Sequence, residues 1–190
     1  MSAAPRFPSS IGYNGLRMTA DEYLAIGETP ERYELINGVV FMSPSPSFRH
    51  QRVLRHVLKQ FETCADRLRG LEIAIDTDLA LGEHTVYQPD IAVYAPGRLP
   101  TDAAKLEVAP DLAVEILSPS SRPLDLVTKR DDYEKFGVGE YWVIDPIPVT
   151  LRRWRREGDR LVETPVDALS VSCESVPGLA LDLAKVRAAM

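Results

Sequence analysis

Three scarcities limit what this 190-residue chain can be. It has two cysteines, Cys64 and Cys173, which lie far apart and outside any CxxC spacing, and its three histidines form no convincing zinc set. No stretch approaches the roughly 18 apolar residues that cross a bilayer. The first 15 residues also lack the apolar core of a secretory signal. We therefore expect a cytoplasmic protein with reduced thiols, no structural disulfide and no membrane partner.

Positive charge is scarce overall but concentrated in two segments. The net charge of −6 argues against a protein coated in basic surface for nucleic acid. Residues 47–70 nevertheless carry six Lys and Arg against two Asp and Glu, and residues 151–160 carry five against two. These segments could contact a negatively charged partner, or they could equally be solvated faces of an acidic protein.

Length and composition are those of one globular domain. A chain of 190 residues can bury a substantial core, and its 45% hydrophobic and 26% charged content is ordinary for a globular protein. No internal repeat and no linker divides it. Residues 1–18, which begin with a Pro/Ser/Gly-rich stretch, are expected to be flexible, and residues 19–190 to form a single domain.

The first third of the chain predicts a helix, a hairpin and a longer helix. Thr19 and Glu22 in "TADEYLAIGE" form a capping box, and "RYELINGVVFM" (32–42) places Asn-Gly between apolar runs, as in a type I′ hairpin. The long helix is expected over about 48–69. Its buried stripe is predicted to contain Leu54, Leu58, Phe61, Ala65 and Leu68, and its basic stripe Arg49, Arg52, His56 and Lys59.

The remaining sequence alternates strands with helices. We expect strands at "EIAIDTDLAL" (72–81), "YQPDIAVYA" (87–95), "PDLAVEIL" (110–117) and "EYWVID" (140–145). A helix is expected over about 122–136, a second hairpin over 149–164 and a closing helix in "ALDLAKVRAAM" (180–190). The sequence thus predicts a mixed α/β fold with a central sheet flanked by helices.

One acidic residue interrupts the most apolar strand. The run Leu112–Leu117 is apolar at every position except Glu115, and such a run predicts a strand buried on both faces. A buried carboxylate is costly unless it is paired, hydrogen-bonded or bound to a metal. Glu115 therefore needs a partner.

The following helix offers that partner. At about 100° per residue, Lys129 falls within the apolar stripe that includes Leu126, Tyr133 and Phe136. We therefore expect Lys129 to approach Glu115, although its long stem could instead carry the amine to solvent. A buried Glu–Lys pair could be purely structural, but it adds little stability compared with apolar residues, which favours a functional role.

A second carboxylate stands at the head of another strand. Asp90 follows Pro89 in "QPD", where an Asp is also common turn chemistry. Together, Asp90 and Glu115 could hold Mg²⁺, which prefers oxygen ligands and keeps several waters. Lys129 beside them could orient a water or stabilise charge that develops on a phosphate.

Four stretches resemble the Uma-two family, which is assigned to the PD-(D/E)XK restriction-endonuclease-like superfamily. They are "RYELINGVVFMSPSPSFRHQRV", "YQPDIAVYA", "APDLAVEILSPSSRPLDLVTKRDDYEKFGVGEYWVIDP" and "VPGLALDL". The resemblance runs from about residue 19 to 183, and the block from 109 to 146 is its most specific part. It implies a restriction-endonuclease-like core, a mixed β-sheet flanked by helices with an N-terminal β-hairpin extension, and a divalent-metal site on the strands.

The resemblance also implies roles for individual residues. Asp90 matches the first metal-binding acid, Glu115 matches the second, and the carbonyl of Ile116 would add a ligand. The lysine usual two positions after the second acid is missing, because Leu117 stands there. The family supplies its lysine from the next helix, and Lys129 occupies that place, in agreement with the helical periodicity.

Two further residues match family positions, and each has an alternative role. Glu34 matches a family acid that could complete the metal shell, but by strand alternation it shares a hairpin face with Arg32 and could form a surface pair with it. His50 matches a family histidine at the start of the long helix. Its place beside the helix's apolar stripe favours a core-edge histidine over a member of the site.

Other candidate residues favour ordinary structural roles. Asp76 and Asp78 fall on one face of a predicted strand and are expected to face solvent, with an additional acid pair as the alternative. Trp154 among four arginines could stack on a base or on an arginine, but such a run is more typical of an exposed hairpin strand. Tyr133, one turn after Lys129, is expected only to pack its ring.

The sequence therefore predicts an Mg²⁺-dependent endonuclease that hydrolyses DNA phosphodiester bonds, with Mn²⁺ able to substitute. Asp90, Glu115 and Lys129 are the expected catalytic residues, and Asp90, Glu115, Ile116 and Glu34 the expected metal ligands. Two alternatives stay open: a catalytically inert binding or assembly module on the same fold, and a metal-dependent hydrolase of another phosphate ester. A homodimer would bring two sites to two DNA strands, but the sequence does not decide the oligomeric state.

Overall fold

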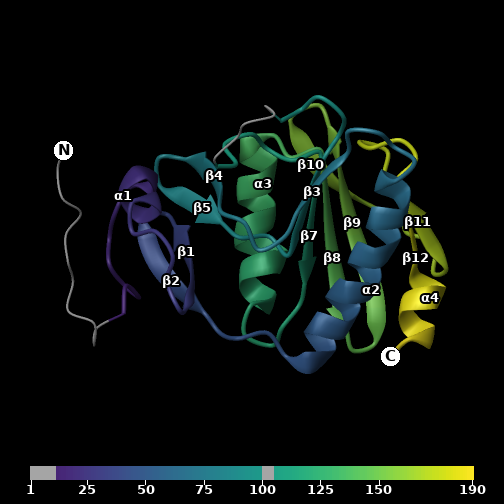
Figure 1. Ribbon diagram of the computed structural model, residues 1–190, viewed down its shortest axis with the longest axis horizontal. Helices are drawn as coiled ribbons and strands as arrows, with labels where there is room; N and C mark the ends of the chain where they lie inside the picture. The colour runs from purple at the N-terminus through teal and green to yellow at the C-terminus, as the bar shows by residue number, and fades with distance from the viewer. Residues whose placement is uncertain (1–11, 100–104) are drawn as a thin grey trace.

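The computed structural model describes residues 12–99 and 105–190 (Figure 1). Within those residues, no helix is both long and apolar enough to cross a bilayer. The elements in chain order are α1 (Ala20–Leu24), β1 (Arg32–Ile36), β2 (Val39–Ser43), α2 (Phe48–Ala65), β3 (Glu72–Ala74), β4 (Leu79–Gly82), β5 (Thr85–Tyr87), β6 (Ile91–Tyr94), β7 (Leu112–Ile116), the π-helical segment η1 (Leu124–Lys129), α3 (Arg130–Phe136), β8 (Glu140–Pro146), β9 (Val149–Glu157), β10 (Arg160–Thr164), β11 (Ser170–Ser172), β12 (Ala180–Asp182) and α4 (Leu183–Ala188).

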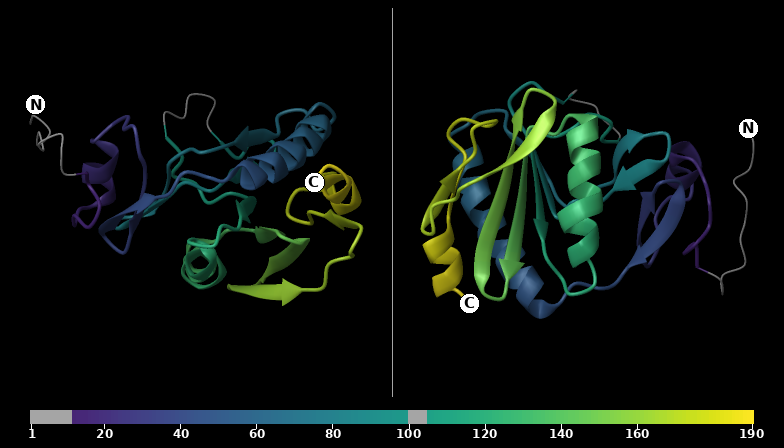
Figure 2. Two further views of the ribbon diagram at one scale, coloured as in Figure 1. Left: turned by 90° about the horizontal axis from the view of Figure 1, so that it is seen from below. Right: turned by 180° about the vertical axis from the view of Figure 1, so that it is seen from behind.

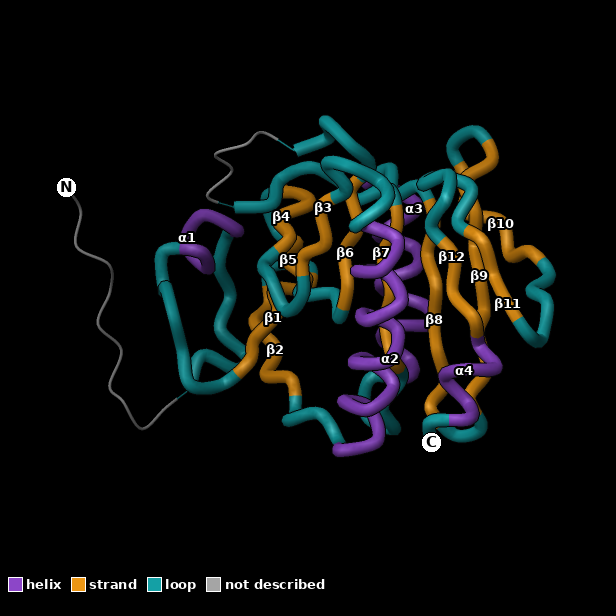
Figure 3. The backbone as a smooth tube through the Cα atoms, turned by 45° about the vertical axis from the view of Figure 1, so that its right-hand side comes forward, coloured by secondary structure: helices purple, strands orange, loops and turns teal. Residues whose placement is uncertain are grey.

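A six-stranded mixed sheet forms the centre of the molecule, which confirms the predicted fold class. Its strand order is β10-β9-β8-β7-β6-β3, with β7 and β8 parallel and the other neighbours antiparallel. α2 crosses one face of this sheet, and α3 covers the other (Figures 2 and 3). The sheet is thus enclosed between helices, as the continuous apolar run of β7 requires.

Strand β7 is buried along its whole length, so its two faces enter two separate cores. Val114 and Ile116 pack on the α2 side with Phe61 and Trp142. Ala113 packs on the opposite side, in the cluster that includes Tyr133 of α3. Because side chains alternate along a strand, Glu115 points toward α3 rather than α2.

The predicted N-terminal hairpin forms, but it is part of a second sheet. Asn37 and Gly38 both have positive φ (51° and 75°), as a type I′ turn needs. β1 pairs with both β2 and β5, which gives a four-stranded sheet of order β2-β1-β5-β4. The hairpin is therefore held against the body of the domain along β5 and is not an isolated extension.

Two of the predicted strands are each divided between the two sheets. Pro89, which has no backbone N–H, separates β5 from β6 within "YQPDIAVYA". Asp76, at φ 46°, separates β3 from β4 within "EIAIDTDLAL". The prediction of one continuous strand was wrong in both places, and the same two connections join the hairpin sheet to the central sheet.

Smaller differences concern the ends of elements. The capping box of Thr19 and Glu22 is present, and Gly137 ends α3 in the left-handed conformation. The long helix stops at Ala65, and the closing helix is only six residues long because 180–182 form β12. The buried residues of α2 are His50, Val53, Leu54, Val57, Phe61 and Cys64, so the predicted stripe was displaced by about one residue over part of its length.

The N-terminal segment is described only from residue 12. Residues 1–11, the greater part of the segment predicted to be flexible, lie outside the described residues. Gly15 donates a backbone hydrogen bond to Val40, whose own N–H donates to Leu16. The end of this segment therefore lies along the outer edge of β2.

Glu140 provides a test of how the C-terminal loop is held. It is completely buried; Oε2 accepts a hydrogen bond from the Trp142 indole (2.8 Å), and Oε1 accepts from the backbone N–H of Glu174 (2.6 Å) and Ser175 (3.0 Å). Glu140→Gln should lower the free energy of unfolding by about 1–3 kcal/mol, because its amide N–H₂ would face another donor. Urea denaturation measures this change.

The matched control is Glu163→Gln, which removes one charge from an exposed pair with Arg152. It should alter stability by less than about 0.5 kcal/mol. Equal effects of the two substitutions would show that the buried network does not stabilise the fold.

Candidate active site

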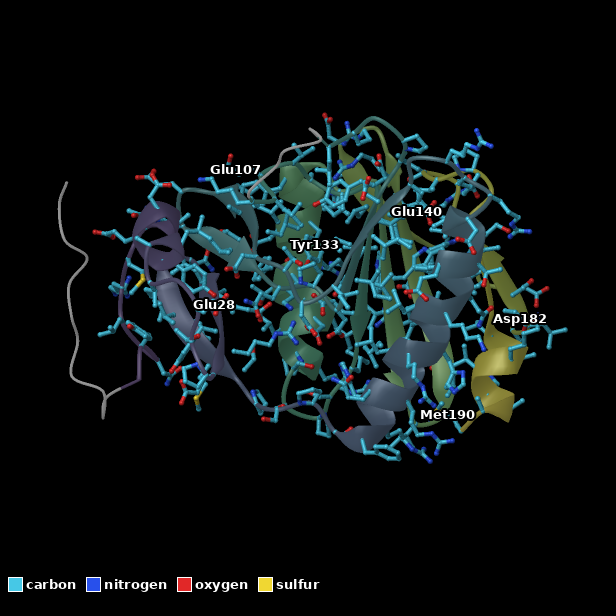
Figure 4. All side chains as sticks on the ribbon, in the orientation of Figure 1. Glu28, Glu107, Tyr133, Glu140, Asp182 and Met190 are labelled. Carbon is cyan, nitrogen blue, oxygen red and sulfur yellow. The ribbon has the colours of Figure 1, made fainter. Side chains whose placement is uncertain are left out.

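Four carboxylates and one lysine from separate segments meet where β1, β6 and β7 approach the start of α3. Each is at most 3% exposed: Glu34 on β1, Asp90 before β6, Glu115 on β7, and Asp125 and Lys129 on η1. Tyr133, labelled in Figure 4, follows on α3 and lies over the same face of the central sheet. The structure therefore brings together the three predicted catalytic residues.

The register of β6 and β7 places the two expected metal-binding acids opposite one another. Ile91 pairs with Val114, so one further step of the antiparallel register sets Asp90 across from Glu115. Residues directly opposite in such a pair point to the same face of the sheet. Asp90 Oδ2 also accepts a hydrogen bond of 2.7 Å from the backbone N–H of Ile116. The two acids are thus fixed by the backbone pairing itself.

Lys129 is enclosed by three carboxylates. Its Nζ lies 2.8 Å from Glu115 Oε1, 2.9 Å from Glu34 Oε1 and 3.6 Å from Asp125 Oδ1. The inward direction predicted from helical periodicity is confirmed, and the alternative in which the amine reaches solvent was wrong. The π-helical turn that carries Asp125 and Lys129 is a feature often found at functional sites.

The carboxylates of this group outnumber its one lysine. Burial opposes protonation of Lys129, but Glu115, Glu34 and Asp125 outweigh it and raise its pKa well above the ordinary value. Burial raises the pKa of Glu115 well above its usual range, and Asp125, Asp90 and Glu34 add to that rise against the charge of Lys129. Asp125 Oδ1 is buried and accepts no hydrogen bond from the described residues. A further cation would relieve this repulsion.

Asp90 is held by side chains from α2 and β1. Its Oδ2 lies 3.1 Å from His50 Nε2, and its Oδ1 lies 3.6 Å from Arg32 Nη1. Although burial raises the pKa of Asp90, these contacts and the Ile116 N–H lower it overall. His50 is therefore buried at the edge of the core, as predicted, and it also contacts Asp90; a part in the chemistry stays a prediction.

Glu34 is buried rather than paired with Arg32 on the surface. Its Oε1 accepts from Lys129 and from the backbone N–H of Gln88 (2.9 Å). Arg32 instead reaches Asp90 and Asp76, the latter at 3.2 Å. Glu34 therefore holds Lys129 in this structure, and its place in a metal shell remains a prediction.

Two members of the site were missed in the sequence. Asp125 precedes Lys129 by four residues, so the same helical periodicity that indicated Lys129 could have found it. Tyr133, expected only to pack, donates a hydrogen bond of 3.2 Å to Glu115 Oε1. No local sequence pattern predicts this hydrogen bond, because it depends on how α3 lies across β7.

The remaining candidates have other roles. Asp76 is half-exposed and contacts Arg32, whereas Asp78 is part-buried and accepts hydrogen bonds from Gln88 and Tyr23. The expected exposure to solvent is confirmed for Asp76 and wrong for Asp78, and their role as an additional acid pair stays a prediction. Trp154 lies on a hairpin strand as predicted, but it is buried against Tyr141, which leaves no face for a base, and the Arg152 guanidinium lies 4.6 Å from its ring centroid. Of the predicted partners, the structure therefore shows arginine.

A magnesium ion fits this group as a site with few protein ligands. Among residues 12–99 and 105–190, no three carboxylate, imidazole or thiolate side chains are grouped so as to hold a metal together. Mg²⁺, however, usually takes one or two carboxylates and keeps several waters. No described donor contacts Glu115 Oε2, and Asp90 Oδ1 has only the 3.6 Å contact with Arg32. These two oxygens are available to a cation.

Comparisons with known proteins agree with the fold. A crystal structure described as a putative nuclease belonging to DUF820, from Anabaena variabilis, has the same fold, with a TM-score of 0.74 and 23% identity over 90% of this chain and 98% of that one. No curated protein matches the chain. The model of the Uma2 family, described as "Putative restriction endonuclease", matches residues 20–184. The chain therefore belongs to the Uma2 family.

Proposed function

We propose that this protein is an Mg²⁺-dependent endonuclease that hydrolyses DNA phosphodiester bonds. The observation that carries the proposal is the meeting of Asp90 and Glu115 on paired strands with Lys129 Nζ 2.8 Å from Glu115. Family membership supports nuclease activity, while the metal and the DNA substrate rest on the chemistry of these side chains.

Asp90 and Glu115 are the residues that would hold the metal, with the carbonyl of Ile116 as a further ligand. Bound there, Mg²⁺ would polarise the phosphoryl group and lower the pKa of a coordinated water. Tyr133 and Lys129 both donate to Glu115 Oε1, which leaves Oε2 for the metal in this proposal. The backbone N–H of Ile116 and His50 fix Asp90 Oδ2 in the same way.

Lys129 has a second role in the proposal. A buried ammonium beside the metal-binding acids can orient the attacking water or stabilise the negative charge that develops on the phosphate. Glu34 and Asp125 keep this amine protonated and in place. Glu34 is thus assigned first to positioning Lys129.

The proposal predicts that neutralising either acid abolishes cleavage. Asp90→Asn and Glu115→Gln keep the size of each side chain but remove the charge that a metal needs, so each should reduce Mg²⁺-dependent cleavage of plasmid DNA by at least about a hundredfold. The control is Asp131→Asn, an exposed acid on α3 paired with its neighbour Arg130, which should cleave as the wild type does.

Metal binding is measured separately by calorimetric titration with Mg²⁺ and Mn²⁺. The wild type should bind and the two variants should not. Cleavage by both variants at the wild-type rate would place the site elsewhere. A wild type that binds neither ion and cleaves no DNA would favour an inert module, and turnover only of smaller phosphate esters would favour the third hypothesis.

Removing the buried cation should destabilise the protein in a pH-dependent way. Lys129→Met leaves three carboxylates buried together, at an expected cost of about 3–5 kcal/mol near pH 7. Because the folded-state pKa of Glu115 is raised, its ionisation opposes folding increasingly as pH rises, and the loss should shrink as pH falls and the carboxylates take up protons. Urea denaturation at several pH values measures this.

The control for that experiment is Lys135→Met, on the exposed side of the same helix. It should leave stability nearly unchanged at every pH. A Lys129→Met variant as stable as the wild type at pH 7 would contradict the buried ion-paired arrangement.

A further inference from the structure

The two basic segments of the sequence differ in how far they are neutralised. On the β9–β10 hairpin, Arg152 pairs with Glu163 at 2.8 Å and Arg160 with Glu134 at 3.0 Å, and Arg155 pairs with Glu174. Arg153 and Arg156 donate to backbone carbonyls. Three of the five arginines in residues 151–160 are therefore ion-paired within the protein.

The cations on α2 have no such ion-pair partners among the described residues. Arg49, Arg55 and Lys59 are exposed, and none of them forms an ion pair with any described residue. Arg52, half-buried, donates to the carbonyl of Ala189 and likewise forms no ion pair among residues 12–99 and 105–190. Partial burial and the nearby Arg55, Arg52 and Lys59 lower the pKa of His56, which is consistent with a positive potential along the helix.

A groove of about 400 Å³ lies along this side of α2. Phe48, Arg52 and Arg55 line it from the helix, and Ile75 and Asp76 from the β3–β4 connection. Phe48 is 79% exposed, and the Arg52 guanidinium lies 5.9 Å from its ring centroid. The groove thus combines an exposed aromatic ring with unpaired cations.

The groove lies beside the candidate active site. Its wall residue Asp76 pairs with Arg32 at 3.2 Å, and Arg32 also lies 3.6 Å from Asp90. A ligand in the groove would therefore lie next to a side chain that is linked, through Arg32, to Asp90.

We propose that this groove binds an unpaired segment of DNA beside the scissile phosphate, with a base stacked on Phe48 and phosphates bound by Arg52 and Arg55. The inference rests on the proposed function and specifies the form of its substrate. Phosphates favour cations that have no carboxylate partner. An aromatic side chain can stack only on a base whose face is open, which an intact duplex does not offer.

Binding is tested without cleavage, by fluorescence anisotropy of labelled DNA in EDTA. The wild type should bind an unpaired oligonucleotide more tightly than the duplex of the same sequence. Phe48→Ala should weaken binding to the unpaired strand by about tenfold or more, with little effect on the duplex. The matched control is Phe41→Ala, a 46% exposed phenylalanine on β2, outside the groove.

The arginines are tested through the salt dependence of binding. Arg52→Gln combined with Arg55→Gln should reduce the slope of log Kd against log salt by about 0.7 for each lost phosphate contact. Arg152→Gln combined with Arg160→Gln, on the self-neutralised hairpin, should leave the slope unchanged. Thermal melting checks that each variant is folded.

Two results would overturn the inference: tighter binding of duplex than of unpaired DNA, or groove variants that bind like their controls. The proposed function is judged separately. If the wild type cleaves DNA and the groove variants bind and cleave normally, the groove inference is refuted and the nuclease proposal stands. If binding depends on the groove but no DNA is cleaved in Mg²⁺ or Mn²⁺, the nuclease proposal is refuted and the groove inference stands.

Discussion

The ion pairing of Lys129 is the constraint on which the site depends. A single ammonium, 3% exposed, joins Glu34 of the hairpin sheet, Glu115 of the central sheet and Asp125 of its own helix. Desolvating these groups is expensive, and apolar residues of similar size would often stabilise a fold as well or better. The arrangement is therefore better explained by chemistry than by stability, because it holds three strongly interacting charges at defined places.

The ion pairs of the site connect the two sheets. Pro89 ends β5 in the hairpin sheet, and Asp90 then begins the approach to β6 in the central sheet. Arg32 and Glu34, one residue apart on either side of Tyr33, serve different acids: Arg32 contacts Asp90, and Glu34 contacts Lys129. The hairpin thus supplies the outer contacts of the site, while the central sheet fixes Asp90 and Glu115, the two proposed metal ligands.

Local patterns in the sequence were enough for the centre of this site and insufficient for its surroundings. A lone acid in an apolar run and a lysine within an apolar helical stripe identified Glu115 and Lys129, because burial of a charge requires a partner nearby. Asp90 needed the resemblance as well. The contacts of His50, Arg32 and Tyr133 depend on strand register and on helix placement across the sheet, which no local pattern encodes. The division of two predicted strands has the same cause, since it is decided by which sheet each half joins.

Charge counting shows the same limit more sharply. The sequence presents two basic segments, residues 47–70 and 151–160, and their composition does not show which of them is ion-paired in the folded protein. The folded chain gives one a set of acidic partners and leaves the other unpaired beside the active site. Nucleic-acid affinity depends on cations that can exchange counterions for phosphates, so net charge is a poor guide and the unpaired fraction is the better one. An acidic protein can then present cations next to a buried acidic site, because the two kinds of charge lie on different segments of the fold and do not cancel.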